Sequence, residues 1–334
     1  MTGALAPRAG AAYSRILGLG GYRPSRVVTN DDICEHIDSS DEWIRERSGI
    51  VTRHFAAHDE TVVDMAAAAS EKAMAAAGLT AADIDTVVVA TVTHLSQTPS
   101  AAAVLADRLG IADPGAFDIS AACAGFSYGI ALADDMVRGG SAQHVLVLGV
   151  EKLSDMVDPT DRGTAFIFGD GAGAAVVGPS DVPRIGPVVW GADGAQADAI
   201  EQDVFWTVLR DEPGHAFPKL KMSGQQVFRW AVFDMAKAAQ RALDAAGVSV
   251  DQLDVFVPHQ ANMRITDAMI KQLGLPATVA VARDIATTGN TSAASIPLAA
   301  SSMLESGEAK SGDLALFIGF GAGLVYSAQV VVLP

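Results

Sequence analysis

The sequence predicts an α/β fold in which the two halves of the chain repeat one layout. Apolar runs of strand length alternate with longer amphipathic stretches along the chain, and many of these runs are uniformly apolar. Uniformly apolar strands are typical of sheets that helices bury on both faces. The segment from Ala76 to Val89 also reads like the segment from Ala245 to Pro258. We therefore expect two copies of a β/α unit around a pseudo-twofold axis.

The repeated unit reads as a helix end, a glycine, a short loop and an apolar strand. Gly78 provides the helix stop in the first copy and Gly247 in the second. We expect strands at Ile16–Gly20, Thr86–Thr91, Ala116–Ile119, His144–Val150, Gly173–Val177, Val255–Val257, Leu314–Ile318 and Tyr326–Val332. We expect helices at Thr61–Ala77, Ala101–Leu109, Ala124–Arg138, Gln225–Ala246, Met263–Leu273 and Ser295–Glu305.

The repeat also sets the expected organisation of the chain. A similar offset aligns Cys123 with Asn290, Met136 with Met303 and Gly140 with Gly307. The stretch Pro179-Ser180-Asp181-Val182-Pro183 marks the junction between the halves. We expect a flexible tail over residues 1–14, a half over residues 15–180 with the cysteine, and a half over residues 181–334 with the histidine and asparagine. Residues 190–222 include Pro213, Gly214 and Pro218 and are expected to form irregular surface loops or a cap.

Composition narrows the possible functions. The chain has 334 residues, 50% of them hydrophobic, which is enough for two core-forming units. Its formal net charge of −16 argues against nucleic acid and against an anionic membrane surface as partners. Met1 to Ser14 lacks the apolar core of a signal peptide. The two cysteines do not indicate a disulfide scaffold, and a working thiol fits a cytoplasmic protein. We interpret Cys34, in a short amphipathic helix, as a packing residue.

Cys123 lies where an apolar run gives way to an amphipathic pattern from Tyr128 to Val137. This change predicts a tight strand-to-helix turn with the thiol in the first turn of the helix. Unpaired N–H groups and the positive end of the helix dipole there stabilise a thiolate. A buried structural cysteine is the alternative for any lone cysteine. Two distant segments favour the nucleophile.

These segments carry His259 and Asn290. His259 follows the apolar strand at Val255–Val257 and Pro258, and Asn290 lies in a turn that leads into another predicted helix. Taken singly, a core histidine and a helix cap or turn asparagine are the simpler interpretations. The duplication, however, places matching strand ends around one axis. Cys123, His259 and Asn290 are therefore expected to converge.

The motifs around these residues carry a family resemblance. They are Ser40-Asp41-Glu42-Trp43-Ile44, Ala122-Cys123-Ala124-Gly125-Phe126, Phe168-Gly169-Asp170-Gly171-Ala172-Gly173-Ala174, Pro258-His259-Gln260-Ala261-Asn262 and Gly289-Asn290-Thr291-Ser292-Ala293-Ala294-Ser295. The chain resembles, nearly end to end, a β-ketoacyl-ACP synthase III. The resemblance implies a thiolase-like fold with duplicated βαβ halves in five α-β-α-β-α layers. Gly169 to Gly173 alone lacks the spacing of a dinucleotide-binding loop.

The resemblance implies an acyltransferase with a ping-pong reaction. An acyl-CoA acylates Cys123, and malonyl-ACP then loses CO₂ and attacks the acyl-thioester, which initiates fatty-acid synthesis without a cofactor or metal. His259 and Asn290 would stabilise the enolate, and neither needs to be charged. The thiolate would be favoured by the helix start and by His259. The N–H groups of Cys123 and Ala322 are the expected oxyanion donors, although the family usually has glycine at the position of Ala322.

The remaining site residues are also carried over from the resemblance. Trp43, Arg47, Arg162, Gly224 and Asn262 are expected to contact CoA and its pantetheine arm. Arg229, Arg264 and Lys271 are expected to form a basic docking face for acyl carrier protein, with Gln272 where the family often has a second basic residue. Thr98, Ile167 and Phe168 are expected at the starter pocket. The loop with Thr98 would reach across a homodimer, and its small side chain predicts acceptance of branched or longer starters.

Related classes of enzyme fit the sequence less well than a β-ketoacyl-ACP synthase III. Type III polyketide synthases also use Cys, His and Asn, but the Trp43 and Arg264 segments favour the ACP-dependent enzyme. A biosynthetic thiolase would carry a second catalytic cysteine near the C-terminus, and a hydroxymethylglutaryl-CoA synthase would need a catalytic glutamate that the motifs do not place. A non-catalytic chain-length factor usually lacks the nucleophile. A starter-unit ketosynthase of a specialised polyketide pathway remains the alternative.

Overall fold

The fold contains two five-stranded sheets with the same strand order. In this computed structural model, which describes residues 8–212 and 214–334, the first sheet has the order β5-β4-β6-β7-β1 and the second the order β12-β11-β13-β14-β8. In both sheets the first three strands run parallel to one another. The fourth strand is antiparallel to the third, and the fifth is antiparallel to the fourth. The first sheet consists of β1 (Tyr13–Tyr22), β4 (Thr86–Ala90), β5 (Gly115–Ile119), β6 (Val145–Glu151) and β7 (Gly171–Ser180). The second consists of β8 (Val189–Ala192), β11 (Val255–Pro258), β12 (Ala280–Val281), β13 (Leu314–Gly321) and β14 (Val325–Val332).

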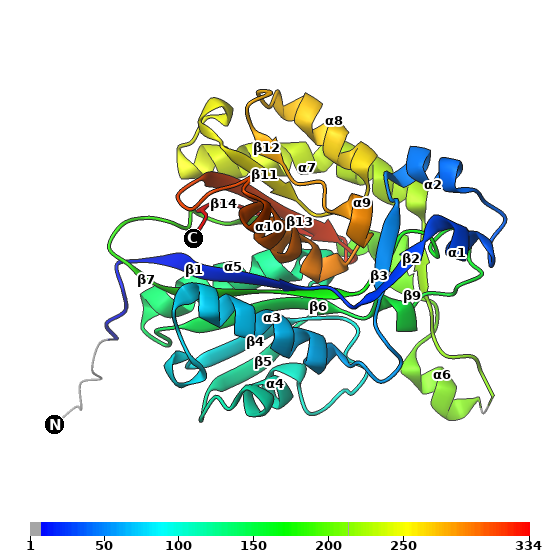
Figure 1. The fold of residues 1–334 in the computed structure, drawn as a ribbon, viewed down its shortest axis with the longest axis horizontal. Coiled ribbons are helices and arrows are strands. Elements are labelled where there is room, and N and C mark those ends of the chain that lie inside the picture. Colours follow the sequence, from blue (N-terminus) through cyan, green and yellow to red (C-terminus); the bar gives the residue numbers. More distant parts are fainter. Residues whose placement is uncertain (1–7, 213) are drawn as a thin grey trace.

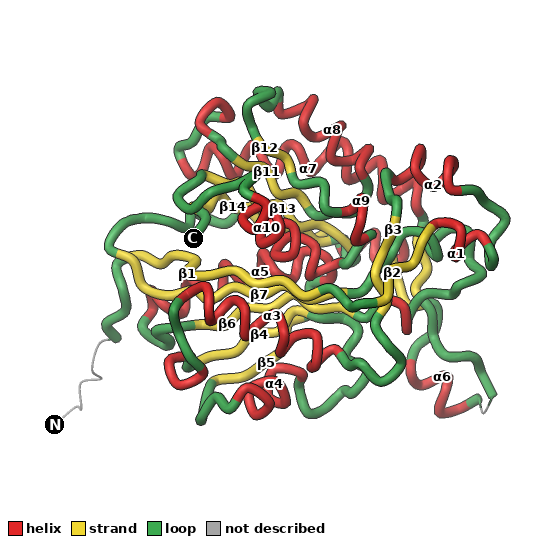
Figure 2. Tube along the Cα trace, in the orientation of Figure 1, coloured by secondary structure: helices red, strands yellow, loops and turns green. Residues whose placement is uncertain are grey.

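The helices complete five layers, as the sequence predicted. Helices α3 and α4 cover the outer face of the first sheet, α7 and α8 cover the outer face of the second, and α5 and α10 lie between the sheets (Figure 1; Figure 2). The duplicated α/β arrangement is thus confirmed. The helices are α3 (Val62–Ala77), α4 (Ala101–Leu109), α5 (Gly125–Gly139), α7 (Gly224–Ala246), α8 (Met263–Leu273) and α10 (Ser295–Ser306).

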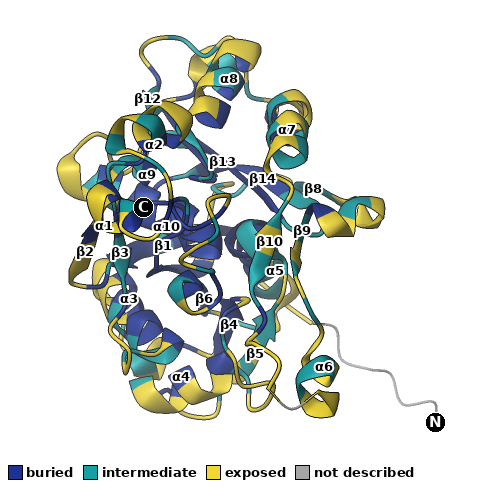
Figure 3. Cartoon of the chain, turned by 90° about the vertical axis from the view of Figure 1, so that its right-hand side faces the viewer, coloured by how far each residue is buried: buried dark blue, intermediate teal, exposed yellow. Residues whose placement is uncertain are grey.

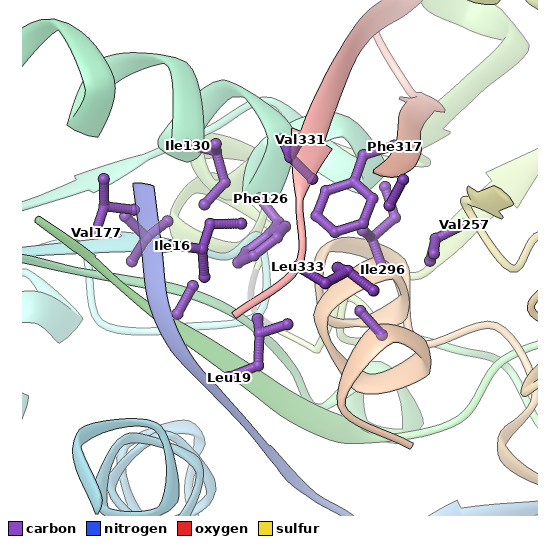
Figure 4. Close-up of a cluster of buried hydrophobic side chains, with 14 of the residues drawn as sticks. Ile16, Leu19, Phe126, Ile130, Val177, Val257, Ile296, Phe317, Val331 and Leu333 are labelled. Atoms are coloured by element: carbon purple, nitrogen blue, oxygen red, sulfur yellow. The ribbon is translucent and has the colours of Figure 1, made fainter. Parts of the chain in front are cut away.

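The central layer joins the two sheets through one apolar core. Phe126 of α5 and Ile296 of α10 meet Ile16 of the first sheet and Phe317 of the second (Figure 4), and all four side chains are buried. Figure 3 shows the contrast with the outer helices α4, α7 and α8, which expose one face to solvent. Burial of α5 and α10 on all sides explains their many small residues, because both sheets must approach them closely.

The starts of α5 and α10 correspond in detail. Each follows a short 3-10 turn, Ala122–Ala124 before α5 and Ser292–Ala294 before α10, and both turns begin in a left-handed conformation, with φ of 43° and 51°. Cys123 therefore corresponds to Ala293, and its predicted alignment with Asn290 is wrong by three residues. Because α5 has 15 residues and α10 has 12, the alignment of the helix ends at Gly140 and Gly307 still holds.

Several short elements escaped prediction. Beside the first half lie β2 (Arg26–Thr29), α2 (Asp41–Ser48) and β3 (Thr52–Phe55), and near the second lies α9 (Ile285–Thr288). The short helix expected around Cys34 is present as α1 (Asn30–Cys34). The segment 190–222, expected to be irregular, contains part of β8 as well as β9 (Ile200–Gln202), α6 (Trp206–Asp211) and β10 (Leu220–Met222). Strands of three residues are too short for a recognisable period, and β9 and β10 are defined by their antiparallel pairing with each other.

Part of the expected N-terminal tail is paired with the rest of the chain. Of the expected tail, residues 1–7 lie outside the described residues, and β1 already begins at Tyr13. The Ala11 N–H donates to the Val137 carbonyl, so backbone pairing begins before residue 15.

Cys34 is half-buried against an apolar cluster that includes Ile33 and Ile44, as expected of a packing residue. No helix in residues 8–212 and 214–334 has the length and apolar character that crossing a bilayer requires.

Candidate active site

One cavity of about 500 Å³ brings the three predicted reactive residues together. Cys123 comes from the 3-10 turn before α5, His259 from the end of β11 and Asn290 from the loop after α9, and all three line this cavity. The three segments meet because the carboxyl ends of β5 and β11 and the starts of α5 and α10 face the same central region. The predicted convergence of residues far apart in the sequence is therefore observed. Among the described residues, no group of three or more His, Cys, Asp or Glu side chains is placed to hold a metal ion.

Cys123 lies in a tighter and less polar environment than the sequence suggested. Its 3-10 turn precedes α5, and Gly321 of β13 lies so close that an added Cβ would be 2.9 Å from the Cys123 Sγ. Burial raises the pKa of the thiol to about 12, while a hydrogen bond with Ser292 lowers it and the Glu151 carboxylate raises it. The expectation that the thiol pKa is lowered is therefore wrong, because desolvation raises it.

Asn290 is held by both halves of the chain. Its N–H donates to the Ile167 carbonyl at 2.9 Å, and its carbonyl accepts from the Gly169 N–H at 3.0 Å. Its side-chain Oδ1 accepts from the Ser292 N–H at 2.8 Å, which leaves the amide NH₂ as the free donor. A side chain at Gly169 would collide with the Thr288 carbonyl oxygen. The glycine-rich motif that begins at Phe168 thus permits this close approach.

His259 is buried and neutral. Its imidazole Nδ1 lies 2.7 Å from the Ser295 Oγ, and its backbone N–H donates to the Ile318 carbonyl. The ring of Phe320 packs against the imidazole edge-on, with 5.2 Å between the ring centroids. Burial lowers the pKa of His259 from 6.5 to about 3. The imidazole is therefore neutral near pH 7 and cannot stabilise a thiolate through a positive charge.

Glu151 is a site residue that the sequence analysis missed. It ends β6 and is fully buried, and burial raises its pKa to about 7. Its carboxylate accepts hydrogen bonds from Thr91, Val92, Thr93 and Ser292. A carboxylate at the end of an otherwise apolar strand was the signal that could have identified it, because an unpaired buried charge is costly. Phe320 and Ser295 escaped notice because neither residue type stands out in its motif.

The predicted CoA contacts gather around Trp43. The guanidinium of Arg162 lies 4.8 Å from the centroid of the Trp43 ring, and that of Arg47 lies 5.6 Å away. An adenine between Trp43 and Arg162 would need about 3.5 Å on each side, so Arg162 must swing away to admit it. Trp43, Arg47, Gly224 and Asn262 line the cavity. Asn262 also caps α8 and donates to the Arg47 carbonyl at 2.9 Å, which ties α8 to α2.

The predicted docking residues share one exposed face of α7 and α8. Arg229 lies on α7, Arg264 and Lys271 lie on α8, and all three are exposed. The Arg264 guanidinium stacks over Phe228 of α7 at 5.2 Å. Gln272 donates to the Val232 carbonyl at 2.6 Å, so it links the two helices where the sequence analysis noted a missing basic residue.

The other predicted residues divide into two groups. Ile167, Phe168 and Ala322 line the cavity. Thr98 lies in the exposed loop between β4 and α4, and within one chain it does not line this cavity. Its predicted role depends on a second subunit and stays a prediction.

Comparison with family models and curated relatives places the chain among known proteins. Residues 117–194 match the model for 3-oxoacyl-[acyl-carrier-protein (ACP)] synthase III, and residues 243–333 match the model for the C-terminal part of the same family. A beta-ketoacyl-[acyl-carrier-protein] synthase III of Streptomyces glaucescens is 62% identical over 98% of both chains. A mycobacterial beta-ketoacyl-[acyl-carrier-protein] synthase III of Mycobacterium marinum is 55% identical over 99% of this chain and 98% of its own.

Solved structures of ketosynthases are also similar to this chain. The priming beta-ketosynthase of the R1128 polyketide biosynthetic pathway superposes with a TM-score of 0.96, at 48% identity over 99% of both chains. The 3-oxoacyl-[acyl-carrier-protein] synthase III of Aquifex aeolicus superposes with a TM-score of 0.88, at 38% identity over 96% of this chain and 99% of its own.

The neutrality of His259 has a pH signature. Because its folded pKa is about 3 and its ordinary value is 6.5, the unfolded chain takes up a proton between these values and the folded chain does not. The stability that the neutral imidazole contributes is therefore full above pH 6.5 and is lost as the pH falls toward 3. We expect the ¹³Cε1 NMR signal of His259, assigned with a His259→Asn variant, to keep its neutral shift at pH 5. A titration midpoint near pH 6.5 would contradict this assignment.

Proposed function

Because the chain belongs to the 3-oxoacyl-[acyl-carrier-protein] synthase III family, we propose that it condenses an acyl-CoA starter with malonyl-ACP and thereby initiates fatty-acid biosynthesis. The products are 3-oxoacyl-ACP, CO₂ and free CoA. The observation that carries the proposal is the meeting of Cys123, His259 and Asn290 on one cavity. Thiol, imidazole and amide supply a nucleophile and two hydrogen-bond donors, so the proposed steps call on no cofactor.

The first half-reaction transfers the acyl group to the enzyme. Sγ of Cys123 attacks the thioester carbon of acyl-CoA, and collapse of the tetrahedral intermediate breaks the bond to the CoA sulfur. The intermediate carries a negative oxygen, which needs donors that are already in place. The N–H groups of Cys123 and Ala322 are the proposed donors, and Ala322 lines the cavity beside Cys123. An alanine supplies the same N–H group as the glycine that is usual in the family.

The second half-reaction forms the new carbon–carbon bond. Loss of CO₂ from malonyl-ACP leaves negative charge on the thioester oxygen, and the enolate carbon attacks the acyl carbon on Cys123. The bond from that carbon to Sγ then breaks, and the released thiolate takes up a proton from solvent. The Asn290 amide NH₂ is a free donor for this oxygen because Oδ1 is already bonded to the Ser292 N–H. For His259, we propose that Ser295 donates to Nδ1, which leaves Nε2–H as the second donor. A neutral donor suits this step because no proton has to be removed from it.

A second candidate function is starter-unit synthesis for a polyketide pathway. It is favoured by the likeness to the R1128 priming beta-ketosynthase, whose TM-score of 0.96 exceeds that of the Aquifex enzyme at 0.88. The chemistry at Cys123 would be the same, and the pathways would differ in the carrier protein and the starter. Turnover with carrier proteins of both kinds, measured side by side, would distinguish them.

Acyl carrier protein is the proposed protein partner, docked on the face formed by Arg229, Arg264 and Lys271. The whole chain carries a net charge of −16, so a local basic surface is needed to attract an acidic carrier. The three exposed cations on α7 and α8 supply it close to Gly224 and Asn262, which line the cavity. This arrangement would let a pantetheine arm enter between α7 and α2.

We also propose a homodimer that forms around β5. This strand is an edge of the first sheet, and large apolar side chains are exposed both on β5 and on the segment 92–104 before it. Their exposed fractions are 41% for Val92, 46% for Leu95, 38% for Val104 and 38% for Phe117. An apolar surface beside an unpaired strand edge is typical of an interface. A partner on this surface would bring the Thr98 loop to a second cavity.

We further propose a cytoplasmic location, where a reducing environment keeps the Cys123 thiol free.

The roles of the three reactive residues predict different losses. Cys123→Ala should abolish condensation, because the chain offers no other thiol in the cavity. His259→Ala and Asn290→Ala should slow malonyl-ACP decarboxylation by roughly 10²- to 10³-fold while acylation of Cys123 continues. Release of ¹⁴CO₂ and mass spectrometry of the Cys123 peptide measure the two steps, with the exposed His36→Ala variant as control. Full decarboxylation by His259→Ala would remove the proposed enolate donor.

Carrier docking predicts a change in KM. Arg264→Glu should raise the KM for malonyl-ACP and leave acylation by acyl-CoA nearly unchanged. The effect should shrink with added salt, because exposed charges are screened. Lys310→Glu, which makes the same charge change elsewhere on the surface, serves as the control. Equal damage to both half-reactions would show that Arg264 supports the fold instead.

Starter size tests the Thr98 loop. We expect the protein to accept isobutyryl-CoA beside acetyl-CoA, since each additional buried methylene contributes about 0.8 kcal/mol. Thr98→Phe should suppress the larger starters and spare acetyl-CoA, as measured with a panel of acyl-CoA substrates. An unchanged starter profile in this variant would exclude Thr98 from the pocket.

A further inference from the structure

Helix α7 carries one aromatic side chain that packs against nothing of similar size. Phe233 is 60% exposed, which among the described residues is more than any other large apolar side chain except Phe205 at 81%. The other aromatic residues of α7, Phe228 and Trp230, pack against the outer core of the second half. A single exposed apolar residue is common on protein surfaces. The position of Phe233 therefore decides whether it has a role.

Phe233 lies at the edge of the basic docking face. Arg229 precedes it by four residues on α7, and residues four apart share one face of a helix. The carbonyl of Val232, the residue before Phe233, accepts from the Gln272 side chain at 2.6 Å. Lys271 and Gln272 of α8 therefore run beside this turn of α7, and both helices turn an exposed face to solvent (Figure 3). The exposed ring continues the docking face along α7.

The charges around the ring are positive and free. Among the described residues, no carboxylate forms a salt bridge with any of the three docking cations. The acidic side chains of the same two helices nearby are already paired. Asp234 lies 3.0 Å from the Lys237 ammonium, and Asp267 lies 2.8 Å from the Arg283 guanidinium. An apolar ring bordered by unpaired cations is complementary to an apolar side chain bordered by carboxylates.

We propose that Phe233 is an apolar anchor for acyl carrier protein on the docking face of α7 and α8. The inference rests on the proposed function and adds a contact to its docking step. Charge complementarity selects an acidic partner. The ring adds a second requirement, which is that the carrier presents an apolar side chain between its carboxylates. Buried aromatic rings often dominate the affinity of an interface, whereas charges at its rim mainly steer the encounter.

Direct binding tests the anchor without any turnover. The probe is fluorescently labelled holo-acyl carrier protein, and fluorescence anisotropy with the full chain gives its Kd. Phe233→Ala should raise the Kd about tenfold. Phe233→Leu should stay within about threefold of the unaltered protein, because leucine keeps most of the apolar contact.

Salt separates the anchor from the cations. Attraction between exposed charges is screened by salt, whereas contact between apolar groups is not. The ratio of the Kd values of Phe233→Ala and the unaltered protein should therefore be the same at low and at high NaCl. The corresponding ratio for Arg264→Glu should shrink as NaCl is added.

Two controls accompany the measurement. Alanine has a higher helix propensity than phenylalanine, so α7 should stay folded in Phe233→Ala and acylation by acyl-CoA should be unchanged. Val182→Ala removes another exposed apolar side chain, 48% exposed in the loop after β7, and should leave the Kd unchanged. Because binding needs no turnover, a protein that binds the carrier through Phe233 and forms no 3-oxoacyl-ACP would contradict the proposed function and retain the anchor.

Several results would overturn the anchor. They are a Kd in Phe233→Ala equal to that of the unaltered protein, a loss of affinity that disappears with added salt, and no carrier binding by the unaltered protein. A change in oligomeric state in Phe233→Ala, measured by analytical ultracentrifugation, would also overturn it, because the ring would then contact a second copy of this chain.

Discussion

Two helices packed between two sheets determine where chemistry can occur in this protein. Because α5 and α10 are packed between the two sheets and their first turns are buried, their starts cannot be moved without disturbing both sheets and the core around Phe126 and Phe317. Each start is a 3-10 turn with one left-handed residue, and the two turns meet at the centre of the molecule. Cys123 lies in one turn, and Asn290 lies two residues before the other. The duplicated fold thus forms an enclosed site from segments that are distant in sequence.

Burial of the site also explains the pKa shifts of its titratable groups. Desolvation raises the pKa of Cys123 to about 12 and of Glu151 to about 7, and lowers that of His259 to about 3. All three shifts favour the neutral form of the group. The site therefore relies on oriented hydrogen-bond donors rather than on fixed charges. Such donors are most effective where negative charge develops only during the reaction, as on a thioester oxygen.

The sequence predicted the features that repeat or follow a regular period. The long helices and most central strands could be identified because apolar runs and glycine stops occur twice in the chain, whereas the five layers were implied by the family resemblance. The reactive residues could be identified from their motifs, and the structure brings them together. The alignment of Cys123 with Asn290 could not be corrected from sequence, because the three extra residues of α5 leave no mark in composition. The thiol pKa was misjudged because the helix start is visible in a sequence, whereas the burial of Gly321 against the sulfur is not. Glu151 was missed because its four hydrogen-bond donors come from two distant segments, the loop after β4 and the turn before α10.

The central claim is that Cys123 carries the acyl group between the two half-reactions. The most direct measurement is mass spectrometry of the Cys123 peptide after incubation with isotope-labelled acetyl-CoA, followed by addition of malonyl-ACP. The account predicts that one acetyl group appears on Cys123, that it disappears when malonyl-ACP is added, and that the label is recovered in 3-oxoacyl-ACP. Formation of labelled 3-oxoacyl-ACP with no acyl group detectable on Cys123 at any time, or with the label on another residue, would contradict it.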